Sequence, residues 1–332
     1  MKVYTYENTK TDIPNWENTT HETQKYGYGY ETDTHFVHFY GQQEPFYIIS
    51  VGVTVIEGKT GIYEDWIKNR FGAIDIQELN LEAGNTIKGI WRPSLIYWDD
   101  IEKALQINSV ERRSQEQALR VLVEKLDELL IFIEPSTDGL KSYSHKTREL
   151  LILACTEVEN QWRALLNLAN HLPINGRSFT TNDYVKLLPV AYLDEYQIEL
   201  KNYDSLSPHK PFSGWNVSNP SQSLSWYDAY NKTKHDRDSH FSEAKFQFAI
   251  DAVAANIIMY CVRFGALMLL QDTNTLSGLI KQIFNIKIIG SNRKSFYIPK
   301  LEFPADTRTD CFIYDSYRAK HNKPWIVNNF QV

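Results

Sequence analysis

The densest group of side chains that could act on a substrate lies within residues 230–240, which read Tyr-Asn-Lys-Thr-Lys-His-Asp-Arg-Asp-Ser-His. His235 is the candidate general acid or base, because imidazole changes its charge near neutral pH. Asn231 is the candidate group that orients His235 or the substrate. Cations in this segment suit phosphate, and aromatic rings suit stacking on bases. The candidate substrate-binding residues are Lys232, Lys234, Arg237, Tyr230 and Trp226.

Two other interpretations of this segment remain open. Side chains of the types that bind metals are found at His235, Asp236, Asp238 and His240. Neighbouring residues rarely converge on one ion, and no HExxH spacing occurs, so we expect neither a metal nor a cofactor. The other interpretation is a solvated helix entry capped by Asp238 or Ser239. Cations are not expected at a helix N-terminus, which carries positive potential, and their presence favours a binding role.

Long helices must position this cluster. Apolar residues recur every three or four positions over 109–133 and 144–171, which predicts two amphipathic helices. Asn108 with Glu111 is typical of a capping box at the start of the first helix. A third helix is predicted over 240–271. Residues 172–224 are predicted as a long connection, which continues as an aromatic-rich linker to His235 and the candidate site.

The second predicted helix has two different faces. Its apolar face includes Leu151, Cys155, Val158 and Trp162, which would pack into a core. The opposite face carries a polar stripe along the whole helix. The stripe consists of Glu149, Thr156, Asn160, Arg163 and Asn167. We expect this stripe and residues 230–240 to form the two walls of a groove, either within one chain or across a dimer.

The ends of the chain predict β-structure and extended segments. Residues 1–33 are polar without a helical period, so they are predicted to be extended or irregular. Two β-branched and aromatic runs, 34–40 and 46–56, flank a short turn and predict a hairpin. The predicted fold class is α+β, with a small N-terminal β-containing region, a central helical bundle and an extended C-terminal tail that packs back on the body. The corresponding domains are 1–107, 108–285 and 286–332.

Composition limits the class of protein. A net charge of −6 argues against a strongly basic nucleic-acid binder, although it leaves room for a local basic patch. The three cysteines form no CxxC pair, so neither a zinc ribbon nor a disulfide scaffold is expected. The apolar stretch 252–270 contains Arg263, which favours a buried core helix over a membrane span. No apolar signal segment is found at the start, so we expect a cytoplasmic protein.

The order of these elements resembles a HEPN domain. The resemblance rests on the helix that contains residues 148–159, a connector, the sequence Tyr230-Asn231-x-x-Lys234-His235 and a further long helix. It covers about residues 109–285. HEPN domains are helical bundles of prokaryotic toxins and antiviral effectors, and many are dimeric, metal-independent endoribonucleases. Their motif is Arg, then four to six residues, then His, so Asn231 and His235 match while Tyr230 occupies the position of the arginine.

The resemblance implies a function in bacterial defence or stress response. The expected protein is a HEPN-like dimer that binds RNA, and the sequence leaves open whether it also cleaves RNA with His235 as acid or base. The alternative is a non-catalytic scaffold or interaction module, in which Asn231 and His235 only fix the linker to the bundle. An open, positive groove around the two side chains would favour the enzyme. Burial with hydrogen bonds to the backbone would favour the scaffold.

Overall fold

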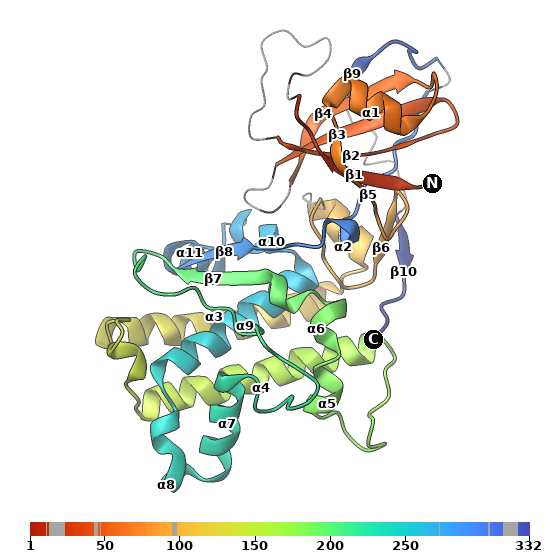
Figure 1. The fold of residues 1–332 in the computed structure, drawn as a ribbon. Helices are drawn as coiled ribbons and strands as arrows, with labels where there is room; N and C mark the ends of the chain where they lie inside the picture. Colours follow the sequence, from red (N-terminus) through yellow and green to blue (C-terminus); the bar gives the residue numbers. More distant parts are fainter. Residues whose placement is uncertain are drawn as a thin grey trace. The chain divides into compact units, whose positions relative to one another are not determined.

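The computed structural model describes residues 1–10, 12, 24–42, 46, 48–94, 98–271, 273–304, 306–314 and 325–332. The fold is α+β and comprises two compact units, which Figure 1 shows as ribbons. Unit 1 contains Met1–Gln106 and Ser291–Asn328, and unit 2 contains Ile107–Gly290 and Asn329–Val332. Most of the segment predicted as a C-terminal tail therefore belongs to unit 1, together with the N-terminal region.

Unit 1 is built on a six-stranded antiparallel sheet with the strand order β5-β1-β2-β3-β4-β9. The predicted hairpin is present as β3 and β4, with His35 opposite Gly58, and part of its turn lies outside the described residues. A parallel pair, β6 with β10, joins the two chain segments of the unit. The elements of unit 1 are β1 (Val3–Glu7), β2 (Tyr26–Glu31), β3 (His35–Gln42), β4 (Ile48–Gly58), α1 (Tyr63–Phe71), β5 (Ile74–Glu78), β6 (Asn85–Ile87), α2 (Trp98–Leu105), the 3-10 turn η4 (Arg293–Ser295), β9 (Phe312–Tyr314) and β10 (Ile326–Asn328).

Residues 1–33 are predicted to be extended or irregular, and where the structure describes this segment the extended alternative is confirmed, because β1 and β2 pair there. Strand β2 alternates tyrosine with glycine, a period of two that fits a strand. Glycine is required for space: a Cβ on Gly29 would lie 2.3 Å from the Tyr63 hydroxyl, and one on Gly27 would lie 2.1 Å from the Tyr6 ring. The missing side chains make room for aromatic residues of β1 and α1.

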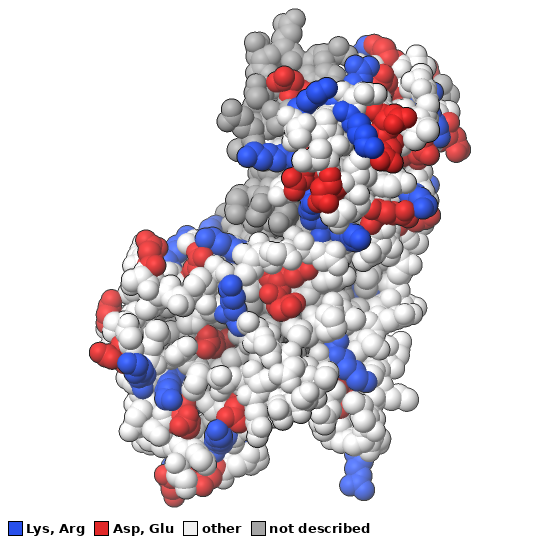
Figure 2. Space-filling model, in the orientation of Figure 1, with Lys and Arg blue, Asp and Glu red and all other residues white. Residues whose placement is uncertain are grey.

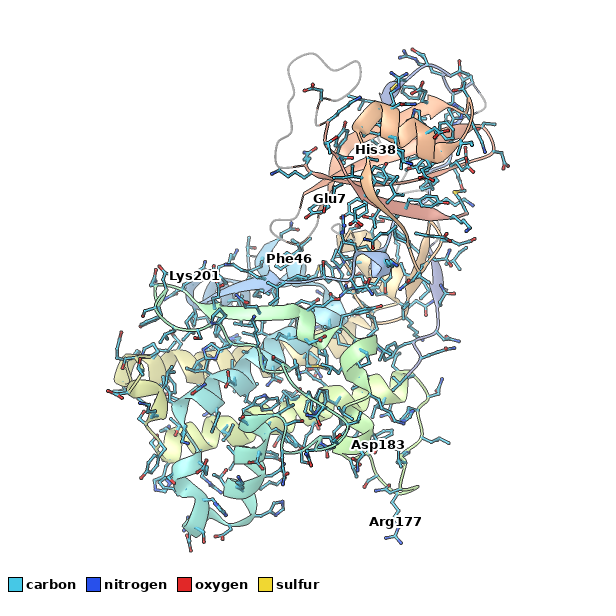
Figure 3. All side chains as sticks on the ribbon, viewed as in Figure 1. Glu7, His38, Phe46, Arg177, Asp183 and Lys201 are labelled. Carbon is cyan, nitrogen blue, oxygen red and sulfur yellow. The ribbon has the colours of Figure 1, made fainter. Side chains whose placement is uncertain are left out.

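Helix α1 covers one face of the sheet and closes an aromatic core. His38 lies in this core on β3 and is fully buried (Figure 3). Its ring stacks on Phe71 with centroids 3.6 Å apart, and its Nδ1 is hydrogen-bonded to the Tyr6 hydroxyl at 2.6 Å. Its Nε2 is buried without a partner. Burial therefore holds the pKa of His38 well below 6.5, because a charged imidazole would lose its hydration.

Unit 1 is therefore expected to lose stability in mild acid. The unfolded chain protonates His38 below pH 6.5 while the folded chain does not, so the free energy of unfolding falls as the pH falls. The loss is about 1.4 kcal/mol per pH unit until the folded-state pKa is reached. Hydrogen exchange of the β3 amides should show this slope in the wild type. His38→Gln should reduce it, and equal slopes in both proteins would contradict the prediction.

Unit 2 is predominantly helical. Its two-stranded antiparallel sheet, β7 with β8, connects residues that are far apart in sequence. The principal helices α3, α4 and α9 pack against one another, and α7 packs on α4 and α9 (Figure 1). The elements are α3 (Ser109–Phe132), η1 (Gly139–Lys141), α4 (His145–Leu168), α5 (Thr181–Tyr184), α6 (Leu187–Val190), η2 (Leu193–Glu195), β7 (Tyr196–Leu200), α7 (Ser225–His235), α8 (Arg237–His240), η3 (Phe241–Glu243), α9 (Phe246–Phe264), α10 (Ala266–Gln271), α11 (Thr275–Ile283) and β8 (Phe284–Ile288).

Two predictions for this region are wrong. The aromatic-rich linker over 225–235 is helix α7, and the single helix over 240–271 is divided into α8, η3, α9 and α10. The second difference has a local cause, because Lys245 takes an extended backbone conformation as the N-cap of α9. At the other end, Gly265 has a φ of 97°, which ends α9 before α10 begins.

Helix α9 is the central helix of unit 2. It is long and apolar enough to span a membrane by composition, but 83% of its apolar window is buried in the structure. Asn256 is the main polar group of its core face. Its amide donates to the carbonyls of Ala154 and Ala252 at 2.9 and 2.8 Å, and its Oδ1 accepts from Gln161 at 2.8 Å. This network fixes α9 against α4, as expected of a core helix.

Candidate functional site

Helix α7 carries the predicted site and owes its position to its aromatic face. Trp226, Ala229, Tyr230 and Thr233 recur at helical spacing and are buried. Tyr227 is buried beside them, and its hydroxyl donates to Glu159 of α4 at 2.6 Å. The opposite side of α7 therefore faces solvent.

The aromatic face of α7 packs on Trp162 of α4. This ring is fully buried and lies 5.5 Å from Tyr227 and 4.9 Å from Trp215, centroid to centroid. Phe212 and Trp226 lie near the same ring, at 6.3 and 6.2 Å. The connection after β7 and helix α7 are thus held by one aromatic cluster on α4.

Burial changes the roles that Trp226 and Tyr230 can have. Trp226 is 2% exposed, and its Nε1 donates to the Pro211 carbonyl at 2.8 Å. Tyr230 is 0% exposed and lies beneath the ammonium group of Lys234, which is 4.8 Å from the ring centroid. Neither ring presents a face to solvent on which a base could stack. The predicted stacking role is therefore not supported for these two residues, which pack in the core instead.

The predicted cations of the segment differ in their partners. Lys232 forms an ion pair with Asp228 at 2.6 Å, and Arg237 contacts Asp238 at 3.2 Å. Lys234 instead donates to the Tyr230 hydroxyl at 2.7 Å, and this bond is the main cause that raises the pKa of Lys234. Among the described residues, no carboxylate lies within ion-pair distance of Lys234. It remains a cation that is available to an external anion.

Arg148 is a further cation of this site that the sequence pattern assigns only to a helix. Its Nε and Nη2 donate to the Thr233 carbonyl at 3.2 and 2.9 Å, so α4 holds the last turn of α7. A cation is favourable there because the C-terminal carbonyls of a helix carry negative potential. Arg148 is half-buried and forms no ion pair within the described part of the chain. Its contact with α7 could be found only in three dimensions.

His235 and Asn231 lie on the solvent side of α7. His235 is exposed at the last position of the helix, and Asn231 is half-buried one turn earlier. Across the residues that the structure describes, neither side chain has a hydrogen-bond partner. They are therefore not used to fix the helix, and the imidazole is free to exchange a proton with a bound molecule.

The predicted groove is not formed within one chain. Helix α4 contacts α7 through Arg148, Glu159 and Trp162, whereas the polar stripe that includes Asn160 and Asn167 lies on a neighbouring side of α4. The face drawn in Figure 2 shows acidic and basic side chains interspersed over unit 2. The candidate site is thus an exposed helix end with a few cations.

The side chains at this end of α7 can carry out a small number of chemical functions. His235 can accept or donate a proton, and Lys234 and Arg148, which contact the last two turns of α7, can bind a phosphate. Asn231 can hold a hydroxyl or a phosphate oxygen with its amide. These groups suit phosphodiester binding and general acid–base catalysis.

Comparison of the chain with protein-family models, curated protein sequences and solved structures found no match.

Proposed function

We propose that unit 2 is a HEPN-like helical module that binds RNA at the C-terminal end of α7. The observation that carries the proposal is an exposed imidazole at His235 that has no partner among the described residues. It directly follows Lys234 and lies two positions after Thr233, whose carbonyl Arg148 binds. Both cations lack an ion pair with any described residue, so a phosphate would not have to displace a carboxylate. Such groups are the electrostatic requirement for backbone binding.

In this proposal Arg148 has the role that the HEPN motif gives to its arginine. Tyr230 stands at the motif position, but it is buried and cannot supply a guanidinium. Arg148 comes from α4 and contacts the carbonyl of Thr233, two positions before His235. His235 then acts as the proton-transfer group and Asn231 as the group that orients the substrate.

RNA binding by the wild type and by Lys234→Gln tests the proposal. We expect the substitution to weaken the affinity for a labelled single-stranded RNA by about fivefold, because one phosphate contact is lost. The slope of log K against log salt should also decrease by about one unit. Fluorescence anisotropy at several salt concentrations measures both quantities.

The matched control is Arg177→Gln, which removes an exposed cation at a loop tip of the same unit (Figure 3). The control should leave the affinity unchanged. Absence of salt-dependent RNA binding by the wild type, or equal losses in the two variants, would contradict RNA binding at α7.

A non-catalytic interaction module is the second candidate function. The ion pairs of Lys232 and Arg237 favour it, because they neutralise two of the predicted phosphate ligands. This module would bind a protein partner through the solvent side of α7. It would show no RNA affinity in the same titration.

The proposal extends to location and assembly. Three free, buried cysteines fit the reducing cytoplasm, where we place the protein. The resemblance to HEPN domains also leads us to propose a dimer, in which two copies bring their His235 side chains to one RNA. Light scattering of the purified chain tests the assembly directly.

A further inference from the structure

A cavity of about 550 Å³ opens in unit 2 at the N-terminal end of α7, away from His235. Its wall combines the connection after β7, the start of α7, part of α9 and the turn before α4. A cavity of this size accommodates a small metabolite. The lining residues that carry the following argument are Lys141, His209, Lys210, Ser225, Phe248 and Asp251.

His209 lies in this wall and is held by both its backbone and its ring. Its backbone exchanges two hydrogen bonds with Ile198 of β7, at 2.9 and 2.7 Å. Its Nδ1 is hydrogen-bonded to Asp251 of α9 at 2.6 Å. The side chain is only 6% exposed, so the imidazole plane is fixed by backbone and carboxylate together. An imidazole that only covered an apolar surface would not need both of these constraints.

The other ring nitrogen of His209, Nε2, is available to bind a ligand. No described residue forms a hydrogen bond with Nε2 of His209. This atom is also not one of the fully buried polar atoms that lack a partner, so it is accessible from outside the protein. Because a carboxylate only accepts, Nδ1–H donates to Asp251, and the Nδ1–H tautomer leaves Nε2 as an acceptor for a molecule bound at this wall. A hydroxyl group of a ligand would complete this arrangement.

The rest of the wall favours an anion that also carries a ring. Lys210 is exposed at the cavity and has no ion-pair partner in the part of the chain that the structure describes. Lys141 is a second cation, and it is paired with the exposed Asp138. The first residues of α7, Ser225 and Trp226, line the same wall, and the N-cap Leu224 has no polar side chain to bond their N–H groups. Phe248 is half-buried and offers an apolar surface to a sugar or base ring.

We infer that this cavity binds a small phosphorylated polyhydroxyl molecule of mononucleotide size. The phosphate lies between Lys210 and the first turn of α7, and a hydroxyl group donates to Nε2 of His209. Asp251 is a positioning residue, because it acts through the imidazole. This site uses none of the groups proposed to bind RNA, so either site can be present without the other.

Calorimetric titration of the full chain with adenosine 5′-monophosphate and ribose 5-phosphate tests the inference. We expect at least one of them to bind in the millimolar range or tighter, and adenosine and inorganic phosphate to bind more weakly. His209→Asn should weaken binding by about tenfold, since its amide can keep the bond to Asp251 but does not replace Nε2. Lys210→Gln should weaken binding of the phosphorylated probes but not that of adenosine.

Two controls separate ligand binding from folding. Lys210 is exposed, so its substitution leaves the fold intact even if His209→Asn lowers the melting temperature. Arg177→Gln removes a cation from the same unit outside the cavity and should not change the affinity. The inference is overturned if neither phosphorylated probe binds up to about 10 mM, or if Lys210→Gln and Arg177→Gln bind them as the wild type does.

Discussion

Trp162→Ala is expected to lower the free energy of unfolding of unit 2 by about 4 kcal/mol. The ring is 0% exposed and lies within 6.3 Å of five other aromatic rings, centroid to centroid. Its removal would leave a cavity beneath both α7 and the preceding connection. We expect faster hydrogen exchange in α7 than in α9, because Asn256 holds α9 to α4 independently.

Trp162→Phe is the matched control for this loss. The indole Nε1 is buried without a hydrogen-bond partner, so phenylalanine retains an aromatic ring while removing an unsatisfied donor. We expect a cost of about 1 kcal/mol for this change. Urea unfolding of the two variants measures the difference, and equal stabilities would show that the aromatic cluster does not determine the position of α7.

The helices that begin at strong caps were predictable from the sequence. Asn108 caps α3, and its Oδ1 accepts from the backbone N–H groups of Val110 and Glu111. Among the described residues, Glu111 makes no hydrogen bond back to the Asn108 backbone, so the predicted capping box is incomplete. The Glu111 carboxylate instead accepts from Arg263 of α9 at 2.5 Å. Capping by a side chain is local, whereas the choice of Arg263 depends on tertiary packing.

Helix α7 could have been predicted from its own period. Trp226, Ala229, Tyr230 and Thr233 follow a helical spacing, but the many polar and aromatic residues favoured the interpretation as a linker. The division of the predicted helix over 240–271 was harder to predict from the sequence. Apolar spacing continues through Gly265, and only the backbone φ of 97° shows that the chain turns there.

The contacts that define the two sites depend on the fold. Arg148 reaches Thr233 across 85 positions, and His209 reaches Asp251 across 42. No local pattern relates these residues, because α4, α7 and α9 bring them together only after packing. The sequence could therefore indicate where titratable side chains cluster, but it could not indicate which cations remain without an ion pair.

His235→Ala is expected to lower the rate of RNA cleavage by about hundredfold or more, if the proposed site is catalytic. In such a reaction the 2′-hydroxyl attacks the adjacent phosphorus and the 5′-oxygen leaves, with His235 transferring one of the protons. Arg148 and Lys234 would stabilise the charge that develops on the phosphoryl oxygens. Because His235 is exposed and unpartnered, its removal should leave the fold and most of the RNA affinity unchanged.

The cleavage assay has two controls, a chemically modified RNA and a variant of a second histidine. A single 2′-deoxy substitution at the scissile position should stop the wild type, because the nucleophile is then absent. His240→Ala changes a half-buried histidine five positions away and should retain the wild-type rate. Cleavage that survives His235→Ala would exclude this residue as the acid or base. RNA binding without cleavage by the wild type would instead identify α7 as a non-catalytic RNA-binding surface, with Lys234 and Arg148 as its phosphate ligands.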